Sequence, residues 1–168
     1  CHLVTLYDLD SSRSEAISES LGIHSVARDF EAITSASDVD IVSIASFDDA
    51  HFEHVVGSLR AGKHVFVEKP LCRSLDELRV IKQIWRKEPG LRIVSNLVLR
   101  AAPLYVWLRD SIRRGEFGEV YAFDGDYLYG RIEKITHGWR SREPCYSVML
   151  GGGIHMVDLM FWTTGQKP

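Results

Sequence analysis

Four short apolar runs alternate with helix-like segments in the first part of the chain, and this alternation limits its fold more than any other feature. The runs are residues 3–7, 41–45, 64–67 and 93–95. Strands separated by helical segments form parallel sheets with right-handed crossovers. The sequence therefore predicts an α/β fold with a doubly wound parallel sheet in a first domain, residues 1–97.

Helix-start signals lie between the runs. Ser12 and Glu15 form a capping-box pattern that predicts a helix ending at Gly22, and Ser74 and Glu77 predict another helix in the same way. This later helix carries an apolar stripe at helical spacing, which we expect to lie in the core. The stripe consists of Leu75, Leu78, Ile81, Ile84 and Trp85.

The chain changes character in its later part, where a second domain is predicted over residues 98–168. A helix is expected from about Leu104 to Arg114. Aromatic residues then alternate at period two, which predicts one face of a strand packed against helices. They are Tyr121, Phe123, Tyr127 and Tyr129. Residues 131–150 read as a long polar loop and a candidate substrate lid. Together these elements predict the beginning of an α+β domain.

Composition excludes several classes of protein. With 45% hydrophobic residues, 26% charged residues and a formal net charge of −3, the chain lacks the polarity of a disordered protein and the basic excess of a nucleic-acid binder. No apolar run approaches the roughly 18 residues of a membrane helix. Cys1, Cys72 and Cys145 show no Cys-x-x-Cys spacing, so we expect neither a disulfide framework nor a metal site. These features suit a reducing compartment such as the cytoplasm.

Charged residues follow the ends of two apolar runs. Ligands of a doubly wound sheet bind outside the carboxyl ends of its strands, which makes Glu68 and Lys69 site candidates. Pro70 restricts the backbone of the preceding lysine. Asp8 and Asp10 follow the first run, and either could be the acidic residue that accepts hydrogen bonds from an adenosine ribose in a dinucleotide site. Simpler interpretations stay open at both places: a solvated charge pair at Glu68 and Lys69, and a helix cap at the aspartates.

The run Gly62-Lys63-His64-Val65-Phe66-Val67-Glu68-Lys69-Pro70 resembles the lysine-bearing motif of the Gfo/Idh/MocA family of nicotinamide-dependent oxidoreductases. Further matches lie on both sides, at residues 38–45, Asn96, Arg100, Pro103 and residues 152–158. The resemblance implies a Rossmann-like domain, NAD or NADP as cofactor, and hydride transfer between that cofactor and a secondary alcohol of a sugar, cyclitol or related polyol. It also implies a homo-oligomer formed through the sheet of the second domain.

The resemblance implies roles for individual residues. His155 would take the hydroxyl proton, Lys69 would stabilise the developing alkoxide and Glu68 would hold the cleft geometry, so we expect Lys69 and His155 to face one cavity. The implied cofactor-binding residues are Asp8, Ala45, Ser46, His51, Glu68, Lys69 and Asn96. The implied substrate-binding residues are Lys69, Arg100, Trp139, Arg140, His155 and Asp158. Asp8 favours NAD, since a carboxylate repels the 2′-phosphate of NADP, and nearby Arg13 weakens that preference.

Two positions depart from the family pattern. Phe47 stands where a proline is usual in the turn before His51, and Gly151 stands where an aspartate usually works with His155. The second departure leaves other functions open: a catalytically impaired homologue that binds a dinucleotide or sugar, or a lyase or transferase with tightly held NAD. Both histidines also have a simpler interpretation as helix-start residues without a ligand, with Asp158 capping the later one.

A glycine-rich G-x-G-x-x-G turn is absent from the sequence. In a dinucleotide site this turn lies about 20 residues before the ribose-binding acid, which would place it upstream of residue 1. We therefore expect the chain to be part of a longer protein and to lack the first strand of the Rossmann-like sheet together with the phosphate-binding turn that follows it. We also expect these residues alone to bind NAD or NADP weakly or not at all, because the turn supplies the N–H groups that stabilise the pyrophosphate.

Overall fold

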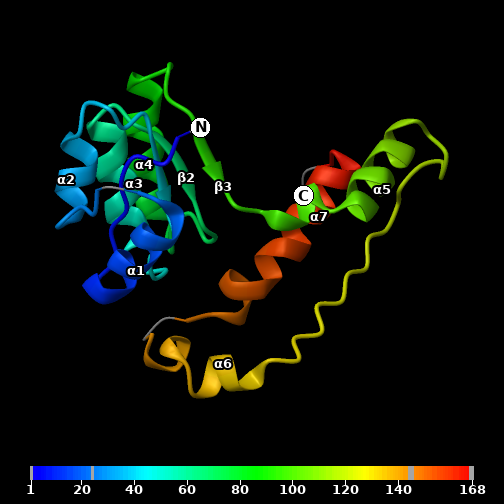
Figure 1. Cartoon of the computed structure of the whole chain (residues 1–168). Helices are drawn as coiled ribbons and strands as arrows, with labels where there is room; N and C mark the ends of the chain where they lie inside the picture. The colour runs from blue at the N-terminus through cyan, green and yellow to red at the C-terminus, as the bar shows by residue number, and fades with distance from the viewer. Residues whose placement is uncertain (1, 24, 144–145, 167–168) are drawn as a thin grey trace. The chain divides into compact units, whose positions relative to one another are not determined.

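The computed structural model describes residues 2–23, 25–143 and 146–166. The chain divides into two compact units, residues 1–95 and residues 96–168. Figure 1 colours the chain from blue at its start to red at its end. Among the described residues, no helix combines the length and the apolar character that a membrane crossing requires.

A parallel sheet forms the centre of the first unit. In the described part of the chain its strands are β1 (Ile41–Ile44), β2 (His64–Val67) and β3 (Ile93–Ser95), in the spatial order β1-β2-β3. The register places Ile44 beside Val67 and Val67 beside Ser95. These strands and their parallel pairing confirm the predictions for the second, third and fourth apolar runs.

Helices cover one face of this sheet. The helices of the unit are α1 (Ser11–Leu21), α2 (Phe30–Ser35), α3 (His51–Arg60) and α4 (Leu75–Lys87). Figure 1 shows α3 and α4 together on one side of β2 and β3. The strand residues on that face are buried with apolar residues of both helices: Val42, Ile44, Val65, Val67, Val55, Leu59 and Ile81. Each such buried side chain contributes about 1.5–3 kcal/mol, so this face is the core of the unit.

The opposite face of the sheet keeps exposed side chains. Ile41, Phe66 and Val94 lie there, one on each strand, and all are exposed. Successive residues of a strand point to opposite faces, which explains why they alternate with the buried set.

The prediction of a strand over residues 3–7 is wrong. In this stretch Leu6 makes an isolated parallel bridge to Val26, and no ladder extends from it among the described residues. In a doubly wound sheet the second strand pairs with the first as well as with the third. The single bridge to Val26 does not make residues 3–7 a strand, because a strand needs a ladder of successive pairs with a neighbouring strand.

Helix capping follows the sequence at one helix and departs from it at another. At α4, the Ser74 side chain accepts from the Glu77 N–H and the Glu77 carboxylate accepts from the Ser74 N–H, which confirms that capping box. At α1 the predicted box at Ser12 is wrong: Asp10 is the N-cap and accepts from the N–H groups of Ser12 and Arg13. An ionised carboxylate one position before the helix is the stronger acceptor for these groups. Gly22 closes α1 with a φ of 65°, as expected.

The apolar stripe of α4 is only partly in the core. Ile81 is buried, whereas Leu75 is 70% exposed and Trp85 is 40% exposed. Leu75 is the first residue of the helix and lies before the turn that meets the sheet. Trp85 uses its ring N–H to donate to the Leu91 carbonyl at 2.9 Å, which fixes the chain leaving the helix.

The regular elements of the second unit are helices and helical turns in its described residues. The long helices are α5 (Pro103–Arg113) and α7 (Ile154–Thr164), which pack against each other and lie side by side in Figure 1. The 3₁₀ turn η1 (Val98–Ala101) precedes α5, and the π-helical turn η3 (Met149–Gly153) leads directly into α7. The predicted helix near 104–114 is therefore confirmed.

Two predictions for this unit are wrong. The aromatic stretch near residues 121–129 is no strand: it runs as an extended trace between α5 and α6 (Ile132–Thr136), drawn in yellow-green and yellow in Figure 1. The alternation sets the faces of a strand but cannot supply a pairing neighbour, and none lies beside it among the described residues. The expected loop at 131–150 instead contains α6, the 3₁₀ turn η2 (Trp139–Arg142) and the start of η3. Pro144 and Cys145 of this stretch lie outside the described residues, as does Cys1.

Candidate active site

The carboxyl ends of the parallel strands carry several of the residues that the sequence singled out. Ala45 and Ser46 follow β1, Glu68 and Lys69 follow β2, and Asn96 follows β3. The register sets the ends of β1 and β2 side by side, and the Glu68 N–H donates to the Ile44 carbonyl at 2.9 Å. The turns after these two strands therefore form one edge, where ligands of doubly wound sheets bind. The peptide bond between Lys69 and Pro70 is cis.

His51 ties these two turns together. It is the first residue of α3 and is fully buried. Its Nδ1 lies 2.6 Å from the Pro70 carbonyl oxygen and its Nε2 lies 3.0 Å from the Ser46 carbonyl oxygen. Both ring nitrogens thus face main-chain carbonyls of the protein. A contact of His51 with a cofactor stays a prediction, and what the structure shows is a link from the turn after β1 to the turn after Lys69.

His54 is a second histidine at this edge, and the sequence reading missed it. It lies three residues after His51 on α3, and its Nδ1 is 3.0 Å from the Ser46 hydroxyl. Its ring packs against Phe30 with a centroid separation of 4.4 Å. Burial lowers the pKa of His54 from its ordinary value. The available signal was the i, i+3 spacing of the two histidines, which places both on one face of the helix.

The two aspartates at the end of the first segment have different roles. Asp10 caps α1, and its hydrogen bonds with the Ser12 hydroxyl and the Arg13 N–H lower the pKa of its carboxyl. Asp8 accepts from the Asp10 N–H at 3.0 Å through one carboxylate oxygen. The simpler interpretation thus applies to Asp10, and Asp8 remains the candidate for the adenosine ribose.

A cavity of about 410 Å³ lies near the start of the chain. Its walls come from residues 4–5, residues 25–28 and the region of α2, and they include Arg28 and Asp38. None of the residues predicted to bind cofactor or substrate lines it. The cavity therefore does not coincide with the strand-end edge.

Arg100 and Asp158, both predicted to bind substrate, bind each other. Arg100 Nε donates to Asp158 Oδ2 at 2.8 Å and Nη2 donates to Oδ1 at 2.5 Å, a bidentate pair joining η1 to α7. The Asp158 side chain is 10% exposed, and this hydrogen bond raises the pKa of Arg100. The pair fixes the helix that carries His155. A direct contact of either residue with substrate stays a prediction.

His155 lies near the start of α7 and is buried, with 8% of its surface exposed. The tyrosine ring of Tyr127 lies 6.3 Å from its imidazole, measured between centroids. The glycines before it admit two phenol rings: a Cβ on Gly151 would lie 2.1 Å from the Tyr146 hydroxyl oxygen, and a Cβ on Gly152 would lie 2.9 Å from the Tyr127 ring. The sequence reading did not single out Tyr146.

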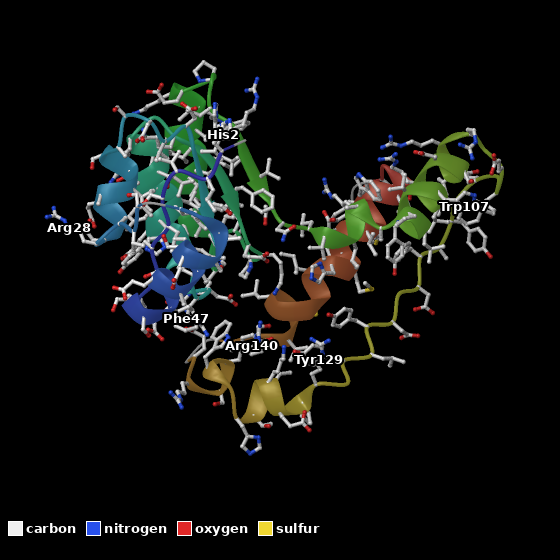
Figure 2. All side chains as sticks on the ribbon, viewed as in Figure 1. His2, Arg28, Phe47, Trp107, Tyr129 and Arg140 are labelled. Atoms are coloured by element: carbon white, nitrogen blue, oxygen red, sulfur yellow. The ribbon has the colours of Figure 1, made fainter. Side chains whose placement is uncertain are left out.

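Trp139 and Arg140 belong to the same neighbourhood of the second unit. The Arg140 guanidinium lies 4.5 Å from the Trp139 ring and 5.9 Å from the Tyr146 ring, both measured to the ring centroid. Figure 2 shows Arg140 pointing from η2 toward the start of α7. The structure therefore brings Trp139 and Arg140 toward the glycine turn before His155. Lys69 lies in the first unit and His155 in the second, and a cavity common to them stays a prediction.

The residues singled out from the sequence carry mainly hydrogen-bonding and charged groups. Within the described ranges, no group of three or more His, Cys, Asp or Glu side chains is placed to hold a metal ion. The strand-end edge offers a hydroxyl at Ser46 and an ammonium at Lys69, and the amide of Asn96 follows the end of β3. Binding of a nicotinamide by these groups stays a prediction. Asp8 fits the ribose of the adenosine half.

Family models match both units. Residues 1–95 match a family described as "Oxidoreductase family, NAD-binding Rossmann fold", and residues 105–168 match the "GFO/IDH/MocA C-terminal domain". The two matches follow each other in the order of the two units and cover most of the chain.

Two of the curated relatives are a sugar reductase and a glucoside dehydrogenase by name. The chain is 30% identical over 175 residues to a 1,5-anhydro-D-fructose reductase of Ensifer adhaerens and 33% identical over 174 residues to a D-glucoside 3-dehydrogenase of Escherichia coli. These alignments cover 99% and 97% of this chain but 50% and 46% of the relatives. The chain thus spans about half the length of the curated relatives it matches.

Solved structures share the fold. A myo-inositol 2-dehydrogenase from Lactobacillus plantarum matches with a TM-score of 0.86 at 22% identity, over 99% of this chain and 50% of that one. A scyllo-inositol dehydrogenase from Lactobacillus casei, solved with NAD(H) and scyllo-inositol, matches with a TM-score of 0.81 at 22% identity, over 98% of this chain and 49% of that one. At such identities the likeness shows the fold alone, and it confirms the predicted Rossmann-like class.

Proposed function

We propose a function from one premise: this chain belongs to the Gfo/Idh/MocA oxidoreductase family. The protein catalyses reversible hydride transfer between NAD and a secondary alcohol of a sugar, a cyclitol or a related polyol. The names of the relatives support this substrate class, since they are a sugar reductase, a glucoside dehydrogenase and inositol dehydrogenases. In this structure the observation that carries the proposal is the strand-end edge, where the turn with Lys69 lies beside the turn with Ser46.

The residues of the chain supply proton transfer and positioning. When bound, the nicotinamide ring accepts the hydride or returns it. His155 removes the proton of the substrate hydroxyl as general base, and Lys69 stabilises the developing alkoxide by a charge-assisted hydrogen bond. Glu68 precedes the lysine at the end of β2 and holds the shape of that turn. Arg100 and Asp158 fix the helix that carries the base.

Asp8 makes NAD the preferred cofactor over NADP. Its carboxylate accepts hydrogen bonds from the two ribose hydroxyls of adenosine and repels a 2′-phosphate. Arg13, five positions later, weakens this preference by its opposite charge. By the family premise the protein also works as a homo-oligomer in the cytoplasm.

The main alternative is a homologue that binds a dinucleotide or a sugar without catalysis. The observation that favours it is Gly151, because a glycine supplies no carboxylate to work with His155. A lyase or transferase that returns the hydride within one turnover is the other alternative.

The test uses the whole protein with NAD or NADP and a panel of inositols, glucosides and anhydro sugars, and it follows the absorbance of the reduced nicotinamide. We expect turnover with at least one polyol, and a loss of about 10²–10⁴-fold in kcat for Lys69→Met. Lys82→Met, at an exposed position of α4, is the matched control and should keep full activity. Cofactor binding without turnover would establish the impaired homologue, product without reduced cofactor would establish the lyase or transferase, and no cofactor binding at all would refute the proposal.

A further inference from the structure

The glycine turn before His155 is filled by a phenol. A Cβ placed on Gly151 would lie 2.1 Å from the hydroxyl oxygen of Tyr146, 2.8 Å from its Cζ and 3.1 Å from its Cε2. Real Cβ atoms essentially never come within 3.0 Å of another atom in this way. The Tyr146 hydroxyl therefore takes the place that a side chain at residue 151 would have, and any residue but glycine there has to displace it.

His155 follows Gly151 by four residues. Residues 151 and 155 are four apart across the junction of η3 and α7, so they share one face of the helix. Side chains of a helix lean toward its N-terminus and cover the turn before their own Cα. These rules direct the His155 side chain toward the turn that contains Gly151, and the hydroxyl of Tyr146 lies against that turn.

The surroundings of this hydroxyl suit a polyhydroxylated ligand. Tyr127 contacts the neighbouring Gly152 and lies 6.3 Å from the His155 ring, so a second aromatic face borders the same turn. The Arg140 guanidinium lies 5.9 Å from the centroid of the Tyr146 ring, and its positive charge strengthens the phenol as a hydrogen-bond donor. Aromatic walls with a few fixed polar groups are the usual lining of a small-molecule site.

We propose that Tyr146 is a substrate-contacting residue of the His155 site, and this inference rests on the proposed function. Its hydroxyl hydrogen-bonds the polyol beside the reacting carbon and holds the substrate hydroxyl toward His155. The phenol is a donor as well as an acceptor, unlike the carboxylate that the family pattern places at residue 151. The glycine is then part of the arrangement, since it leaves the space that the hydroxyl occupies.

Tyr146→Phe tests this inference, because it removes the hydroxyl and keeps the ring that packs on Gly151. We expect kcat/KM for the polyol to fall about 10- to 100-fold, the change expected from one lost hydrogen bond in a polar site. The thermal midpoint should stay within about 1 °C, because the ring and its contacts remain. Tyr121→Phe, at a fully exposed tyrosine of the same unit, is the control and should change neither quantity.

Gly151→Ala provides the second arm. The methyl group displaces the Tyr146 hydroxyl, so kcat/KM should fall about as far as in Tyr146→Phe. The double variant should lose no more than either single variant, because both remove the same contact. Gly130→Ala is the matched control, since a Cβ there meets open space and its φ is ordinary.

The outcomes separate this inference from the proposed function. An inactive wild-type protein would refute the proposed function itself. An active wild type with an unchanged kcat/KM in Tyr146→Phe would refute the role of Tyr146 and leave the proposed function standing. A Tyr146→Phe variant that loses thermal stability while keeping its kcat/KM would show that Tyr146 only packs against the turn.

Discussion

Replacing His51 by alanine should destabilise the first unit more than the same replacement at any other histidine that the structure describes there. The imidazole is fully buried and faces the carbonyl oxygens of Ser46 and Pro70 at 3.0 and 2.6 Å. A neutral imidazole donates to one of these carbonyls, and leaving that carbonyl without a donor costs about 1–3 kcal/mol. The cavity left by the ring adds to this cost, because large-to-small substitutions in a core leave space that the surroundings fill only in part. We expect a total loss of about 4–6 kcal/mol.

Such a loss would be a large part of the total stability of a domain, which is about 5–15 kcal/mol. Urea unfolding followed by circular dichroism measures it, with the free energy of unfolding obtained by linear extrapolation. His51→Gln keeps most of the side-chain volume and one donor group, so its loss should be about half as large. His2→Ala, at an exposed residue, is the control and should stay within about 0.5 kcal/mol of the wild type.

A loss below about 1 kcal/mol in His51→Ala would refute this reasoning. It would mean that the two carbonyls find other donors and that the turns after β1 and β2 do not depend on the histidine. A large loss in His51→Gln equal to that in His51→Ala would show that ring shape, rather than hydrogen bonding, holds the turns together.

Further predictions concern other parts of the chain. Burial holds the pKa of His54 below its ordinary value of 6.5, so the unfolded chain binds the proton more readily than the folded chain does. The thermal midpoint should therefore be highest above about pH 6.5 and should fall as the pH drops through the pKa of the folded state. A pH series should show a flatter decline for His54→Gln, and an equal decline would contradict the assignment. Arg100→Met removes the cation that pairs with the Asp158 carboxylate, which is 10% exposed. It should lower the free energy of urea unfolding by about 1–3 kcal/mol, a value discounted because Arg100 is half exposed. The control Arg79→Met breaks an exposed pair with Asp76 and should cost less than about 0.5 kcal/mol, and equal costs would argue against a structural role for the Arg100 pair. Asp8→Ser should shift the ratio of kcat/KM values from NAD toward NADP by about tenfold, or about 1.4 kcal/mol, and an unchanged ratio would show that Asp8 does not contact the ribose.

The sequence predicted those elements that are determined by residues close together in the chain. The strands near residues 41–45, 64–67 and 93–95 are as expected, because period-two burial and flanking turns set them. The capping box at Ser74 is equally local, since both of its partners lie within four positions. The polar residues at the strand ends could be grouped for the same reason, because parallel strands bring their carboxyl ends to one edge.

Features that depend on distant neighbours could not be predicted. The stretch 3–7 has the composition of a strand, yet its pairing is a single bridge to Val26. Arg100 and Asp158 are 58 positions apart, and only the packing of η1 on α7 shows that they form an ion pair. The same holds for His51, whose partner carbonyl at Pro70 is 19 positions away.

The surroundings of His155 show most clearly what the sequence alone does not predict. Its three preceding glycines are visible in the sequence, and they leave room for a neighbouring group. The sequence does not predict which group fills this space, because the contact of Tyr146 with Gly151 depends on the path of the turn between them. At residue 151, where the family pattern has a side chain, this chain has a glycine, and the hydroxyl of Tyr146 occupies the space.

Transfer of an isotopic label tests the hydride chemistry most directly. The whole protein is given NAD and an active polyol that carries deuterium on the reacting carbinol carbon, and the reduced cofactor is analysed by mass spectrometry. Direct hydride transfer predicts one deuterium in each molecule of reduced cofactor, together with a slower turnover than with the unlabelled polyol. Reduced cofactor without deuterium, or oxidised polyol without reduced cofactor, would contradict the assignment of this protein as a nicotinamide-dependent dehydrogenase.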